Sequence, residues 1–178
     1  MDELKLGGAL ISRERIEART AELAREIARD AAGRELLAVG ILTGAVFFLT
    51  DLVRHMPEDM DVKVDFMSVS SYADATESSG VVRIIQDLKS NIEGKHVLIV
   101  EDIIDTGLTL SYLIEMLQSR RPASLKTCVL LDKSERREKA VEVDWCGFQI
   151  PDAFVVGYGL DCAGKWRHLR DIRTVERA

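Results

Sequence analysis

The chain has few cysteines, and those it has form no recognisable motif. Cys128, Cys146 and Cys162 are an odd number, and no two of them make a CxxC pair. Disulfide-rich secreted proteins have even sets of cysteines, and CxxC pairs are typical of zinc sites. The cysteine pattern therefore argues against both classes and predicts reduced thiols in a cytoplasmic protein.

Long apolar runs and basic runs are also missing. No segment approaches about 18 consecutive apolar residues, so the sequence predicts no membrane span. The opening sequence, MDELKLGGALIS, has neither the basic start nor the apolar stretch of a secretory signal. The net charge is −6 and no polybasic run occurs, which argues against binding to nucleic acid or to a membrane surface.

The elements that the sequence does predict alternate between strands and helices. Ile16, Leu23 and Ile27 have helical spacing within residues 12–30, and Leu110, Leu113 and Leu117 have it in a helix that Thr106 can cap. A further helix is expected over 46–56. Strands are expected over 35–42, 62–72, 81–87, 96–100, 124–133 and 152–161. This alternation predicts an α/β fold, with a mainly parallel, twisted sheet flanked by helices.

One stretch, VLIVEDIIDTG (residues 97–107), combines a buried strand with three acids and a helix start. Ligands of parallel α/β sheets bind beyond the carboxyl ends of the strands, where Glu101, Asp102 and Asp105 are expected. The unpaired amides at the start of the next helix can bind a phosphate without a lysine. Carboxylates beside that phosphate can accept hydrogen bonds from sugar hydroxyls or hold Mg²⁺. The stretch therefore favours a phosphorylated ribose as ligand, with a solvated turn as the alternative.

The same stretch resembles the phosphoribosyl-diphosphate (PRPP) signature of type I phosphoribosyltransferases, and EDIIDTG is similar to the hypoxanthine-guanine branch. Further segments match that family in order along residues 10–173. ILTGA (41–45) matches its pyrophosphate loop, SSYADATESSG (70–80) its flexible lid, and LLDK (130–133) its purine-contacting lysine. FQIPDAFVVGYGLD (148–161) matches its purine-binding segment.

The resemblance implies one phosphoribosyltransferase domain over residues 1–178. Its core would span about 30–140. A small hood would come from about 1–15 and 141–178, and the lid would cover about 70–80. In the lid, Ser71 and Tyr72 would lie nearest the ligand.

The family roles transfer to individual residues of this chain. Asp105 would act as the acid or base at purine N7, and Glu101 and Asp102 would contact the ribose hydroxyls near a magnesium ion. The ribose phosphate would be bound by Asp105, Thr106, Gly107, Leu108 and Thr109.

The purine and pyrophosphate ends are assigned in the same way. Lys133 would contact the purine O6, Phe154 would stack on the ring, and the backbone of Val155 would contact its edge. Asp161, in the purine-binding segment, would coordinate the magnesium ion on the pyrophosphate. Thr43, Gly44 and Arg167 would contact the pyrophosphate, although Thr43 replaces a residue that is often longer and polar or basic in the family.

The implied activity is purine salvage that depends on Mg²⁺. Phosphoribose would pass from PRPP to N9 of hypoxanthine or guanine, giving IMP or GMP plus pyrophosphate in a homodimer or homotetramer. Two alternatives keep the scaffold: a relative that prefers xanthine, and an RNA-binding regulator whose basic face would include SERREK (134–139). A phospho-receiver domain is disfavoured, because too little chain follows Asp102 for its remaining strands.

Overall fold

The computed structural model describes residues 4–71 and 82–177, which form a six-stranded sheet, a small three-stranded sheet and three α-helices. The large sheet has the order β4-β3-β2-β5-β6-β7, and only β4 runs antiparallel to its neighbour. Its strands are β2 (Leu36–Leu42), β3 (Val62–Ser71), β4 (Val82–Gln86), β5 (His96–Ile104), β6 (Ser124–Asp132) and β7 (Trp145–Gln149). The predicted α/β fold with a mainly parallel sheet is confirmed.

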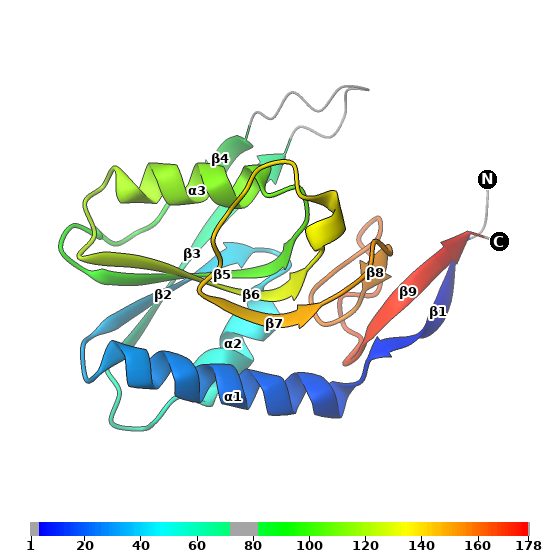
Figure 1. The fold of residues 1–178 in the computed structure, drawn as a ribbon, viewed down its shortest axis with the longest axis horizontal. Helices are drawn as coiled ribbons and strands as arrows, with labels where there is room; N and C mark the ends of the chain where they lie inside the picture. The colour runs from blue at the N-terminus through cyan, green and yellow to red at the C-terminus, as the bar shows by residue number, and fades with distance from the viewer. Residues whose placement is uncertain (1–3, 72–81, 178) are drawn as a thin grey trace.

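Helices cover both faces of the large sheet (Figure 1). α1 (Arg13–Ala31) and α2 (Val46–Arg54) pack on one face, and α3 (Leu108–Gln118) packs on the other. β2 is buried from both sides: Ala38 contributes to the core under α1 and α2, and Val39 to the core under α3. This two-sided burial explains why its sequence is almost continuously apolar.

The small sheet, with the order β1-β9-β8, lies beyond the end of the large sheet (Figure 1). β1 (Leu4–Ile11) pairs with β9 (Ile172–Arg177), and β9 pairs with β8 (Val155–Val156), both antiparallel. It is built from the two ends of the chain, the segments expected to form the hood. The division into one domain with a core and a hood stays a prediction, and β7, which falls within the predicted hood segment, belongs to the large sheet.

Two predicted strands have different bounds. β5 does not end at Val100 but continues to Ile104, because it pairs with β6 as far as Asp132. The predicted strand over 152–161 contains only β8, because the chain turns at Gly157 with φ of 100°. The start of α3 also differs from the prediction. Gly107, and not Thr106, occupies the N-cap position.

Among the described residues, no helix is long and apolar enough to cross a membrane. Most of the predicted lid, including Tyr72, lies outside the described residues. Ser71 closes β3.

Candidate active site

A cleft of about 410 Å³ opens at the carboxyl ends of β2 and β5. It brings together the three parts of the sequence that are predicted to contact pyrophosphate, ribose and magnesium. The residues from those parts that line it are Gly44, Glu101, Asp102, Thr109, Asp161 and Arg167. The position agrees with the general rule that ligands of such sheets bind beyond the strand ends.

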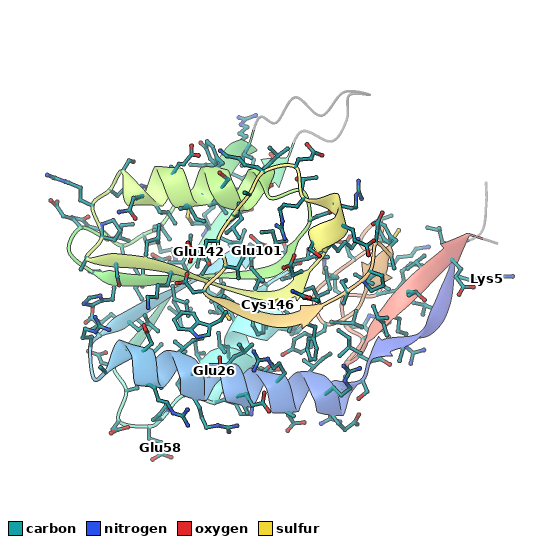
Figure 2. All side chains as sticks on the ribbon, in the orientation of Figure 1. Lys5, Glu26, Glu58, Glu101, Glu142 and Cys146 are labelled. Carbon is teal, nitrogen blue, oxygen red and sulfur yellow. The ribbon has the colours of Figure 1, made fainter. Side chains whose placement is uncertain are left out.

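Glu101 and Asp102 are adjacent acids at the floor of this cleft. Glu101 is 9% exposed and lies between the helix layers (Figure 2), and its buried Oε2 has no hydrogen-bond partner within residues 4–71 and 82–177. Asp102 Oδ1 accepts a hydrogen bond from the Ile103 amide at 2.9 Å. Burial, together with the neighbouring charge of Asp102, raises the pKa of Glu101 well above its usual value. The site therefore favours a proton or a metal cation beside Glu101.

The raised pKa of Glu101 makes stability depend on pH in a definite direction. A carboxyl whose folded-state pKa is raised stabilises the fold below its unfolded pKa, near 4.5, and loses that contribution as pH rises through the folded value. Glu101→Gln removes this loss, so above about pH 5 the variant should be more stable than the wild type by about 1–3 kcal/mol. Thermal unfolding from pH 4 to pH 8 measures it, and a stability difference that does not grow with pH would contradict the assignment.

The loop predicted to bind pyrophosphate (residues 41–45) lies directly against Asp102. A Cβ added to Gly44 would lie 1.6 Å from Asp102 Oδ2, so no larger residue fits there without displacing the carboxylate. The peptide bond between Leu42 and Thr43 is cis. Thr43 is exposed at the surface, whereas Gly44 lines the cleft, so the loop presents its backbone to the site.

Arg167 and Asp161 form an ion pair on the other wall of the cleft. Arg167 Nη2 lies 2.6 Å from Asp161 Oδ1, and Arg167 Nη1 donates to the carbonyl of Gly159 at 2.5 Å. Asp161 Oδ2 also accepts from the Gly164 amide at 2.6 Å. The arginine thus adds a positive charge to a cleft whose floor is acidic.

The chain forms a loop at the start of α3, and a neighbouring segment holds this loop by backbone hydrogen bonds. Gly107 has φ of 85°, and the Leu108 amide donates only weakly to Thr106 Oγ1, at 3.4 Å. The carbonyl of Thr106 accepts from the amides of Glu138 and Lys139 at 2.9 and 3.0 Å. The loop is therefore fixed through its carbonyl, while the first amides of the helix have no intrahelical partner and can bind an anion.

Asp105 connects this loop to a second group of charged side chains. Its Oδ2 lies 3.4 Å from Arg136 Nη1, and its Oδ1 is buried without a hydrogen-bond partner in the part of the chain that the structure describes. Asp152 lies 4.0 Å from Arg136 and 3.9 Å from Lys133 Nζ. Lys133 is only 6% exposed, so it is not an ordinary surface lysine.

Comparisons with known proteins agree with this geometry. The phosphoribosyl transferase domain family model matches residues 9–163. A hypoxanthine-guanine phosphoribosyltransferase from Mycobacterium avium is 50% identical over 173 residues, covering 94% of this chain and 84% of its own.

The chain belongs to the hypoxanthine-guanine phosphoribosyltransferase family.

Solved structures of the family have the same fold. A hypoxanthine phosphoribosyltransferase from Staphylococcus aureus superposes with a TM-score of 0.91 at 46% identity, covering 96% of this chain and 92% of that one. One from Trypanosoma cruzi, in complex with the product IMP, has a TM-score of 0.87 at 45% identity, covering 93% and 92%. The resemblance inferred from the sequence is confirmed at the level of the family and the fold.

The remaining purine-side residues differ in exposure. The Phe154 ring is 56% exposed and available for stacking, whereas the Val155 side chain is 5% exposed and packs in the core. Only the backbone of Val155 can therefore contact a purine. Their roles, like those of the other candidate site residues, stay predictions of the phosphoribosyltransferase assignment.

Sequence reasoning missed Arg136 and Asp152, the two partners of Asp105 and Lys133. The RNA-binding alternative instead places the segment of Arg136 on a basic face. Three of the charged side chains in this segment meet a carboxylate: Arg136 meets Asp105, Arg137 pairs with Asp132, and Lys139 bonds to Glu115. The pairing favours a phosphoribosyltransferase over an RNA-binding surface. No local spacing in the sequence signals that Arg136 meets Asp105 or that Asp152 meets Lys133.

The acids of the cleft fit a magnesium ion held mainly by substrate oxygens. In the described ranges, 4–71 and 82–177, no group of three or more His, Cys, Asp or Glu side chains has the geometry of a complete metal site. Mg²⁺ typically binds one or two carboxylates and completes its shell with phosphate oxygens and water. Glu101 Oε2, buried and unpartnered, and the adjacent Asp102 supply ligands of that kind.

Proposed function

We propose that this protein transfers the 5-phosphoribosyl group from PRPP to N9 of hypoxanthine or guanine, giving IMP or GMP and pyrophosphate. One observation carries the proposal. Asp105, which has a buried oxygen without a partner among the described residues, lies just before the N-cap of α3, and the amide of the buried Lys133 donates to the carbonyl of the adjacent Ile104 at 3.0 Å. A purine and a ribose phosphate bound to these two groups would meet beside the Asp105 carboxylate.

The chain's own residues bind the two substrates separately. The amides of the loop from Thr106 to Thr109 hold the 5-phosphate, and Glu101 and Asp102 accept hydrogen bonds from the ribose hydroxyls. The backbone of Gly44 and the guanidinium of Arg167 contact the pyrophosphate. Their common cleft supports this division of roles.

The reaction forms one bond and breaks another at C1′ of the ribose. N9 of the purine bonds to C1′ as the bond from C1′ to the pyrophosphate oxygen breaks, and the leaving pyrophosphate takes that electron pair. Asp105 takes the proton from N7, which removes the positive charge that would otherwise develop on the purine. Magnesium, held by substrate oxygens and by one or two of the predicted ligands Glu101, Asp102 and Asp161, would supply Lewis-acid stabilisation of the departing pyrophosphate.

Lys133 is expected to select 6-oxopurines. Its ammonium can only donate hydrogen bonds. It can therefore bond to O6 of hypoxanthine or guanine, which is an acceptor, but not to the amino group of adenine, which is a donor. Lys133→Met should therefore lower kcat/KM for hypoxanthine by about 10–100-fold, as expected when a buried polar contact is lost. Lys63→Met, at an exposed lysine on β3, is the matched control. Steady-state kinetics with hypoxanthine and adenine measure both variants, and an unchanged preference would remove Lys133 from the purine site.

A competition assay tests the proposed function as a whole. Hypoxanthine, guanine, xanthine and adenine are supplied together with PRPP, with and without Mg²⁺, and the nucleotides formed are separated. We expect IMP and GMP with release of pyrophosphate, no AMP, and no product without Mg²⁺. Formation of mainly XMP would support the xanthine-preferring alternative, and no product from any 6-oxopurine would refute the proposal.

The proposed function extends to the protein's oligomeric state and location. We propose a homodimer or homotetramer, because the C-terminal region of a Trypanosoma cruzi relative has a role in the oligomeric state and enzymatic activity of that protein. We also propose a cytoplasmic location, which the three free cysteines, Cys128, Cys146 and Cys162, support. Analytical ultracentrifugation determines the oligomeric state.

A further inference from the structure

The turn Gly157–Gly159 lies against the pyrophosphate loop. Its three residues have positive φ values, of 100°, 50° and 105° in order, so the chain reverses sharply after β8. A Cβ added to Gly159 would lie 2.0 Å from the Gly44 carbonyl oxygen, which shows how closely the two backbones approach. A shift of this turn would therefore displace the backbone of Gly44 in the pyrophosphate loop.

The same turn holds Arg167. The Gly159 amide donates to the Arg167 carbonyl at 3.0 Å, and the Gly159 carbonyl accepts from Arg167 Nη1 at 2.5 Å. Arg167 in turn pairs with Asp161. The turn thus sets the position of both the backbone and the side chain that face a bound pyrophosphate.

Tyr158, the central residue of the turn, is anchored to the helix that follows the pyrophosphate loop. Its hydroxyl donates to Asp51 Oδ2 at 2.7 Å, and Asp51 lies on α2. Burial, together with the bond to Asp51, raises the pKa of Tyr158, so the hydroxyl stays a proton donor throughout the neutral range. This hydrogen bond joins the C-terminal turn to α2, beside a contact between the rings of Tyr158 and Phe47, whose centroids lie 6.4 Å apart.

Packing alone does not fix this anchor. A cavity of about 710 Å³ lies beside the Tyr158–Asp51 bond. Its lining includes Tyr158, Asp51, the half-exposed Phe47 and His168. Tyr158 is 8% exposed and belongs to the core, so packing holds its ring, and the bond to Asp51 adds a directional restraint on its hydroxyl.

We propose that Tyr158 is a positioning residue for the pyrophosphate half of the site. It acts through Gly159 on the Gly44 loop and on Arg167, and Asp51 is its fixed point. The inference rests on the proposed function, because it assigns Gly44 and Arg167 to pyrophosphate. It predicts an effect on PRPP and pyrophosphate that the purine does not share.

Tyr158→Phe tests the inference by removing only the hydroxyl. The KM for PRPP, and the KM for pyrophosphate in the reverse reaction, should rise about tenfold, as expected for loss of a hydrogen bond to a charged group. The KM for hypoxanthine should change by less than about twofold, since Lys133 and Phe154 are untouched. Tyr112→Phe makes the same change at an exposed tyrosine on α3 and should match the wild type.

Variants of Asp51, the hydrogen-bond partner of Tyr158, distinguish a positioning role from an effect on stability alone. Asp51→Asn keeps an acceptor oxygen and should stay within about threefold of the wild type, whereas Asp51→Leu should reproduce the Tyr158→Phe phenotype. In an Arg167→Gln background, Tyr158→Phe should add much less than its own tenfold effect, because both changes act on one contact. The melting temperature of each variant is recorded alongside.

The possible failures are distinguishable. If Tyr158→Phe leaves the KM for PRPP unchanged, or raises the KM of purine and PRPP equally, the positioning role is wrong. Full additivity with Arg167→Gln would also overturn it. If the wild type and Tyr112→Phe both fail to turn over PRPP, the proposed function itself fails.

Discussion

Asp105→Asn should lower kcat for IMP formation by about 10²–10⁴-fold, the usual contribution of a positioned acid or base. The substitution keeps the shape of the side chain but removes its ability to accept the N7 proton. Since Asp105 Oδ1 has no partner among the described residues, an amide nitrogen at that position should disrupt no hydrogen bond between them. The KM for PRPP should change little, because the phosphate loop binds through its amides.

The matched control is Asp87→Asn. Asp87 pairs with Arg120 at the surface, away from the cleft, so the same chemical change there should leave turnover near the wild-type level. Presteady-state measurement of the chemical step distinguishes slower chemistry from slower product release. If kcat of Asp105→Asn stays within about threefold of the wild type, Asp105 is not the acid or base of the reaction, because general acid–base catalysis contributes far more than that.

Gly44→Ala should be the most damaging substitution in the pyrophosphate loop. The added methyl would lie 1.6 Å from Asp102 Oδ2 and 2.5 Å from Asp102 Cγ, so either the loop or the carboxylate must move. Displacement of about 1 Å at a catalytic site typically costs about 10²-fold in rate, and we expect kcat/KM for PRPP to fall by at least that factor.

Gly8→Ala is the control for this prediction, because a Cβ at Gly8 on β1 meets no atom within 4 Å. It should retain full activity and a wild-type melting temperature. Circular dichroism and thermal unfolding of Gly44→Ala show whether the loss is local to the cleft. Normal activity of Gly44→Ala would mean that the contact between Gly44 and Asp102 is not needed for PRPP binding.

The sequence predicts the parts of this fold that local patterns determine. β2 is recognisable from its continuous apolar run, because a parallel strand between two helix layers has no solvent face. α1 is recognisable from the spacing of its buried residues, and the structure adds an N-cap at Ser12, whose hydroxyl accepts from the Arg15 amide. The acid motif indicates a ligand site because strand ends and helix starts meet there.

Other features depend on contacts that no local pattern reveals. β1 and β9 pair across almost the whole chain, from Leu4 to Arg177. Arg136, the partner of Asp105, and Asp152, the partner of Arg136 and Lys133, lie in two separate later segments. They meet because β5, β6 and β7 are neighbours. The bond between Tyr158 and Asp51 likewise joins residues 107 positions apart.

A crystal structure with IMP bound tests the central claim most directly. We expect the 5-phosphate to lie against the amides of the Thr106–Thr109 loop. The ribose hydroxyls should lie beside Glu101 and Asp102, and the purine should lie between Lys133 and Phe154 with N7 facing Asp105. A nucleotide bound away from this loop, with the cleft at β5 left to solvent, would contradict the proposed function.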